Sequence, residues 1–167
     1  MRDSVRKMLA ERRAMASPPD DLMQRLMQAR DPETGQTMND ELLIDNLLTF
    51  YLAGHETTAK ALAWTLYLLA RAPQWEQRLV EEVTRVVGDG PVEARHIEEL
   101  TLTTQVLKES MRLFPPAPQT SRMTVEDMDI GGHMIKAGTQ VIVPIYAIQR
   151  HAKLWDNPHV FDPDRFA

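Results

Sequence analysis

Apolar side chains run through residues 39–72 with few interruptions. Asn39 suits a helix N-cap, Asp40 and Glu41 favour the positive end of the helix dipole, and nothing ends the helical pattern before Pro73. This predicts one helix of about 33 residues, or about 48 Å at 1.5 Å per residue. Its apolar residues leave no fully polar face: Leu47, Leu48, Phe50, Leu52, Leu62, Trp64, Leu66 and Leu68. Such a helix belongs in the core of a larger protein, so we expect this chain to be a piece of one.

The other predicted helices are short. They cover a basic segment at residues 2–13 that ends before Pro18, residues 20–30, residues 73–87 with Pro73 at N1, and residues 100–113. We expect a solvated face on the basic helix. Downstream, "MDIGGHMIKAGTQVIVPIYA" predicts short strands, with hairpin turns at Gly131-Gly132 and at Ala137-Gly138. The last residues read as a packed, irregular loop. The fold class is therefore mainly α with a small β region (α+β).

Composition narrows the class of protein. The length of 167 residues fits one domain, and 43% hydrophobic with 26% charged residues is typical of a globular chain. A net charge of -5 without a long basic run argues against nucleic-acid binding. The absence of cysteine excludes disulfides, zinc-thiolate sites and thiol catalysis. No signal peptide is visible, and charged residues interrupt the apolar region, so we expect no membrane segment and a cytoplasmic protein.

A polar island, "AGHETT", lies in the middle of the long apolar helix. Ala53 and Thr57 share one helical stripe, and the small Ala53 and Gly54 would let a flat ligand approach the backbone. Thr57 can bond back to the Ala53 carbonyl and bend the helix, and Glu56 could relay protons. The alternative is a packing glycine among solvent-facing polar residues. His55-Glu56 begins a zinc motif of the type His-Glu-x-x-His, but Ala59 stands at the second ligand position, which excludes zinc.

A second candidate constellation is "KESMR". Glu109 and Arg112 are spaced i, i+3 on a helix and can form a charge-assisted pair. Exposed pairs of this kind contribute little. However, Leu107, Met111 and Leu113 surround the pair in sequence and a proline break follows, which favours burial. A buried pair would need a further partner.

Three motifs together resemble the cytochrome P-450 family of haem-thiolate monooxygenases. "AGHETT" is similar to the family's oxygen-activating motif, "KESMR" to its Glu-x-x-Arg helix, and "FDPDRF" to the loop that supplies a second arginine. Their order and spacing agree across residues 1–167. The resemblance implies the cytochrome P-450 fold, incomplete at both ends, with residues 1–167 as a partial single domain from the central-to-late part of the catalytic domain. The loop with the iron-ligating cysteine is missing.

The resemblance also implies roles for individual residues. Thr57 would hydrogen-bond the oxygen that the enzyme activates, Glu56 would assist proton delivery, and Ala53 and Gly54 would lie against the haem. Glu109, Arg112 and Arg165 would form a structural triad, and Arg122 would bind a haem propionate. The residues that would line the substrate pocket are Phe50, Ala117, Pro118, Gln119 and Thr120.

The implied function is insertion of one O2-derived oxygen atom into an apolar organic substrate. Haem (iron protoporphyrin) would be the cofactor, with electrons from NAD(P)H through a ferredoxin or flavoprotein reductase. Without a cysteine, the isolated chain is expected to be inactive. Two alternatives stay open: a non-enzymatic helical interaction module, and a non-functional truncated product.

Overall fold

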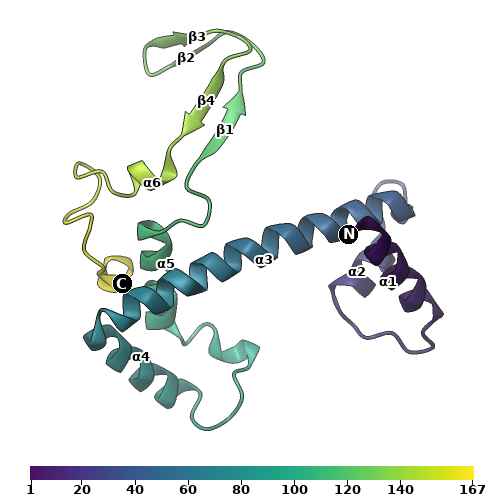
Figure 1. Ribbon diagram of the computed structural model, residues 1–167, viewed down its shortest axis with the longest axis horizontal. Helices are drawn as coiled ribbons and strands as arrows, with labels where there is room; N and C mark the ends of the chain where they lie inside the picture. Colours follow the sequence, from purple (N-terminus) through teal and green to yellow (C-terminus); the bar gives the residue numbers. More distant parts are fainter. The chain divides into compact units, whose positions relative to one another are not determined.

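The computed structural model describes all 167 residues, which form two compact units, Met1–Glu56 and Thr57–Ala167. The boundary falls inside the long helix α3. In chain order the elements are α1 (Arg2–Ala14), α2 (Leu22–Gln28), α3 (Asp40–Ala70), α4 (Pro73–Val86), η1 (Ala94–His96), α5 (Thr101–Leu113), β1 (Thr120–Met123), β2 (Met128–Ile130), β3 (His133–Ile135), β4 (Gln140–Val143), α6 (Ile145–Ile148) and η2 (Pro163–Phe166) (Figure 1). The predicted class, mainly α with a small β region, is confirmed.

The first unit holds α1, α2 and the beginning of α3 around a small core. Leu9, Leu43 and Ile44 are its buried residues. The basic face of α1, expected to be solvated, is in fact paired with acidic residues at the start of α3. Arg13 binds Asp40 at 2.6 Å, for example, and the pairs stay about half exposed. Residues 20–30 were predicted as one helix, but α2 is shorter because Asp21 accepts a hydrogen bond from the Gln24 N–H and caps it.

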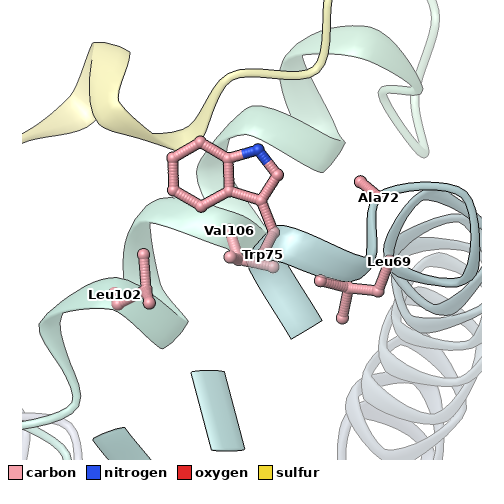
Figure 2. Packing of buried hydrophobic residues seen from close by; sticks show 5 residues of the cluster. All are labelled: Leu69, Ala72, Trp75, Leu102 and Val106. Atoms are coloured by element: carbon pink, nitrogen blue, oxygen red, sulfur yellow. The ribbon is translucent and has the colours of Figure 1, made fainter. Parts of the chain in front are cut away.

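The second unit has its own core where the end of α3 meets α4 and α5. The buried residues are Leu69, Ala72, Trp75, Leu102 and Val106; in Figure 2, Leu102 lies on one side of Trp75, and Leu69 and Ala72 lie on the other. Pro73 occupies the first turn of α4, as predicted, where a missing N–H costs nothing. Phe161 from the C-terminal segment packs against the same core. The C-terminal segment is therefore packed, as predicted, and its only regular element is the short helix η2.

The β region differs from prediction in its pairing. β2 and β3 form the expected hairpin around Gly131 and Gly132, which have φ of 61° and 85°. The Ala137-Gly138 turn was expected to make a second hairpin, and this was wrong. The turn leads into β4, which pairs antiparallel with β1, a strand that the sequence pattern did not reveal. Buried Thr124, just after β1, joins the chain to the segment before β4, because its hydroxyl donates to the Lys136 carbonyl at 2.7 Å.

Helix α3 is as long as the pattern predicted, at 31 residues. Its buried residues lie toward its ends, including Leu43, Ile44 and Leu69. Between them, Phe50 is 49% exposed and Leu66 is 67% exposed. The chain by itself therefore leaves the middle of this apolar helix uncovered. None of the helices combines the length and the apolar character that a membrane crossing requires.

Candidate functional site

The Glu109–Arg112 pair on α5 is the best-defined polar constellation of the second unit. Both side chains are buried, with Glu109 0% and Arg112 2% exposed. Arg112 Nε donates to Glu109 Oε2 at 2.6 Å, and Nη2 donates to Oε1 at 2.8 Å. This two-point geometry follows from the i, i+3 spacing and matches the planar guanidinium to the planar carboxylate.

The remaining donors of Arg112 bind the C-terminal segment. Nη1 donates to the carbonyls of Gln149 at 2.7 Å and Pro158 at 2.8 Å, and Nη2 donates to the Val160 carbonyl at 3.2 Å. An arginine has five N–H groups, so all of them are used here. Arg112 thus joins α5 to the C-terminal segment through three backbone carbonyls. The sequence reading missed these carbonyls, since nothing in a sequence marks a backbone acceptor.

Arg165 approaches the same carboxylate from η2. Its Nε lies 3.4 Å from Glu109 Oε1, and its Nη2 donates to the Asn157 carbonyl at 3.0 Å. The Asp162 N–H also donates to Glu109 Oε1 at 3.0 Å. The structure therefore brings Glu109, Arg112 and Arg165 together. Met111, expected to cover the pair, is 40% exposed, because it points to another face of α5.

Packing around Arg112 comes from the C-terminal segment. The Trp155 ring centroid lies 5.0 Å from Arg112 Cζ, within cation–π range. Pro163, in the turn that opens η2, is fully buried. These residues exclude water from the pair, so its charges interact through a less polar medium than at the surface.

The "AGHETT" motif lies wholly within α3, with Ala53, Gly54 and Glu56 in the first unit and Thr57 in the second. All four are exposed. A Cβ added at Gly54 would meet nothing within 4 Å. The structure therefore gives no packing reason for this glycine. The predicted pocket residues are exposed as well: Phe50 lies on α3, residues 117–119 lie between α5 and β1, and Thr120 is the first residue of β1.

An aromatic stack, which the sequence reading did not find, joins α3, α5 and α6. The Trp64 and Phe114 rings are parallel within 6°, with centroids 4.0 Å apart. The Arg150 guanidinium lies 5.2 Å from the Phe114 centroid and 3.7 Å from that of Tyr146. Burial lowers the pKa of Arg150, and Arg112 lowers it further. The sequence contains one indication of this stack: Trp64 lies two helical turns from Thr57, on the same face of α3.

Arg122 is an exposed residue of strand β1. Its Nη1 donates to Thr120 Oγ1 at 3.1 Å and to the Ser121 carbonyl at 2.8 Å. Neither partner is an anion, so the positive charge is available to an acidic group. This differs from most arginines of the chain, such as Arg12, which binds Asp21 at 2.6 Å.

Comparison with known proteins decides the family. The sequence model of the family described as cytochrome P-450 matches residues 1–167. The chain belongs to the cytochrome P-450 family. Similar relatives include cytochrome P-450 72A13 of Arabidopsis thaliana (38% identical, 99% of this chain and 33% of the relative), pentalenene oxygenase of Streptomyces avermitilis (34%, 99% and 37%) and a putative cytochrome P-450 137 of Mycobacterium tuberculosis (39%, 98% and 32%). The chain spans about a third of the length of these curated relatives.

Cytochromes P-450 bind haem, and some residues present here fit that group. The Arg122 guanidinium has donors left over and no acidic partner among its hydrogen bonds, as a haem propionate requires. Residues 1–167 contain no cysteine, so they do not include the thiolate ligand of the iron. The chemistry of Arg122 thus fits a haem propionate, and residues 1–167 contain no thiolate for the iron.

Proposed function

We propose that the protein is a haem-dependent monooxygenase that inserts one oxygen atom from O2 into an apolar organic substrate. The observation that carries the proposal is the family match over residues 1–167. Further support comes from the Glu109, Arg112 and Arg165 cluster, whose three members stand in the order that the family resemblance implies. One matched relative is a pentalenene oxygenase, which is consistent with oxygenation of an organic compound.

The proposed reaction consumes O2, two electrons and two protons. One oxygen atom enters a C–H bond of the substrate to give an alcohol, and the other leaves as water. NAD(P)H would supply the electrons through a ferredoxin or a flavoprotein reductase. Haem, when bound, supplies the redox chemistry that splits O2. The residues of this chain are proposed to bind haem and substrate and to deliver protons.

Thr57 and Glu56 are the residues proposed to handle protons. The Thr57 hydroxyl can both donate and accept a hydrogen bond, so it can pass a proton without changing its own charge. Glu56 precedes it on α3, and a carboxylate exposed to solvent can exchange protons with water. Ala53 and Gly54, with small side chains or none, would leave room for haem and O2 beside the helix.

Arg122 is proposed to bind a haem propionate, and the Glu109, Arg112 and Arg165 cluster to hold the C-terminal segment in place. The cluster's role is structural, because its arginine donors are directed at backbone carbonyls and at the Glu109 carboxylate. Phe50 and residues 117–119 are proposed to contact the substrate. The exposed apolar side chains of Phe50, Ala117 and Pro118 suit a nonpolar molecule.

Carbon monoxide difference spectroscopy of the full-length protein tests the proposed function. Reduced protein with bound carbon monoxide should show the strongly red-shifted Soret band of thiolate-ligated haem. Incubation with NAD(P)H, a reductase system and a panel of apolar substrates should give a hydroxylated product. A protein that binds no haem, or that shows only a histidine-type spectrum, would refute the proposal.

The proton role of Thr57 is tested by Thr57→Ala in the full-length protein. Haem content should stay at the wild-type level, while product formed per NAD(P)H consumed falls by at least about tenfold, since positioned proton transfer commonly contributes about 10²–10⁴-fold to a rate. Thr57→Ser, which keeps the hydroxyl, should restore most of the yield. Thr58→Ala makes the same change one position along α3 and is the matched control. An unchanged product yield in Thr57→Ala would remove Thr57 from the mechanism.

A further inference from the structure

Thr120 and Arg122 form a local pair on strand β1. Alternate residues of a strand share one face, so the two side chains lie side by side. The Thr120 hydroxyl accepts a hydrogen bond from Arg122 Nη1 at 3.1 Å, and the Ser121 carbonyl accepts a second one at 2.8 Å. Nη1 carries two N–H groups, so these bonds use that nitrogen completely.

The opposite edge of the guanidinium stays available. Nε–H and the two N–H groups of Nη2 take no part in the bonds to Thr120 and Ser121. Nε and Nη2 form the side edge that binds a carboxylate through two parallel hydrogen bonds. Across the ladder, Thr120 faces Val143 and Arg122 faces Val141, so β4 supplies no acidic group to this face. The pair therefore selects which edge of the arginine is presented to a ligand.

We propose that Thr120 is a positioning residue that fixes Arg122 with its Nε–Nη2 edge directed at a haem propionate. The inference rests on the proposed haem-binding function and adds a residue to it. An exposed arginine samples many rotamers, and binding a carboxylate removes that freedom. A side chain already held by two hydrogen bonds has less freedom to lose, so it binds more tightly.

This role differs from the substrate contact expected for Thr120 from the family resemblance. A hydroxyl that accepts from Arg122 acts on haem retention through the arginine. A hydroxyl that contacts substrate acts on substrate affinity and leaves haem retention alone. The two roles therefore predict different measurements.

The experiment measures haem release from the full-length protein to excess apomyoglobin. Thr120→Val keeps the shape of the side chain and removes the acceptor. It should release haem about three- to tenfold faster, the range expected for the loss of one hydrogen bond. Thr120→Ser should stay within about twofold of wild type, because it restores the hydroxyl. Thr104→Val is the matched control, since it makes the same change at another exposed threonine, on α5, whose hydroxyl donates to the Leu100 carbonyl and contacts no arginine in that bond.

A double-mutant cycle separates positioning from general loosening of the strand. In an Arg122→Ala background, Thr120→Val should cause no further increase in haem release, because the residue it positions is absent. An equal increase in both backgrounds would overturn the proposal, and so would a Thr120→Val variant that changes only the substrate dissociation constant. Failure of the proposed function would look different, since the thiolate-type carbon monoxide spectrum would then be missing from the wild-type protein.

Discussion

At the scale of single residues, Arg112 makes the most contacts of any side chain in the candidate site. It is buried, it pairs with Glu109, and its other donors bind three carbonyls that lie 37 to 48 positions further along the chain. Removing it would leave a buried carboxylate and three carbonyls without these donors. A buried charge that loses its partner is costly, because water cannot replace the lost interaction.

We expect Arg112→Ala to lower the free energy of unfolding of the full-length protein by about 3–5 kcal/mol. That is a large share of the roughly 5–15 kcal/mol that stabilises a typical protein. Arg112→Lys should rescue little, since an ammonium group has three donors and no planar edge. Urea unfolding followed by circular dichroism measures both variants.

Arg25→Ala is the control for this prediction. Arg25 pairs with Asp20, and the two side chains are 70% and 75% exposed. Solvent screens such a pair, so its loss should leave the unfolding curve unchanged. If Arg112→Ala behaved like Arg25→Ala, the buried placement of the Glu109–Arg112 pair would be wrong.

At the scale of elements, Glu82 on α4 caps the beginning of α5. Its carboxylate accepts from the N–H groups of Leu102 at 2.7 Å and Thr103 at 2.9 Å, and from the hydroxyls of Thr101 and Thr103. The first N–H groups of a helix have no partner within the helix, and the dipole there favours a negative charge. Glu82 thus fixes where α5 begins and how it meets α4, and α5 in turn carries Glu109 and Arg112.

We expect Glu82→Gln to lower the free energy of unfolding by about 1.5–3 kcal/mol at pH 7, the usual contribution of a hydrogen bond to a charged group. Glu81→Gln is the matched control: Glu81 is the exposed neighbour, and it accepts only from Gln77 at 3.1 Å. Equal losses in the two variants would contradict the capping role.

The pH dependence of the Glu82 effect has a definite sign. Burial alone raises the pKa of Glu82, but the hydrogen bonds from residues of α5 outweigh it, and the pKa lies below its ordinary value of 4.5. A carboxyl with a depressed folded-state pKa stabilises the fold above the unfolded value and loses that contribution as pH falls through the folded value. The stability difference between wild type and Glu82→Gln should therefore be full near pH 7 and shrink below about pH 4.5. Urea unfolding across that range measures it.

At the scale of the whole molecule, each of the two units has its own core, and the apolar residues in the middle of the long helix α3 are largely exposed. Leu62 and Leu66 lie one turn apart on α3 and are 51% and 67% exposed. Neighbouring exposed leucines on one helix face form an apolar patch, and such patches drive association.

Expressed as residues 1–167, the chain should therefore self-associate. Leu62→Lys with Leu66→Lys should shift the sedimentation distribution toward monomer, because charge on the patch opposes its burial. Val80→Lys is the control, since Val80 is an exposed apolar residue of α4, 57% exposed, away from this patch. Association that persists unchanged in the double variant would place the contact elsewhere.

Local rules account for the features that the sequence could predict. Helix α3 follows from an unbroken helical pattern, and the start of α4 follows from Pro73 at N1. The hairpin turn follows from Gly131 and Gly132, which adopt positive φ. The Glu109–Arg112 bond follows from i, i+3 spacing. Each of these depends on residues within about one turn, so the sequence records them directly.

Tertiary structure alone decided the contacts between distant segments. The pairing of β1 with β4, the carbonyls bound by Arg112 and the stack of Trp64 on Phe114 join residues far apart in the chain. Backbone acceptors look alike in every sequence, and a four-residue strand has too few positions to show an alternating pattern. The sequence by itself therefore determined the helices, the local ion pair and the family. The fold decided which segments Arg112 binds, because that choice depends on packing between α5 and residues 37 to 48 positions further along the chain.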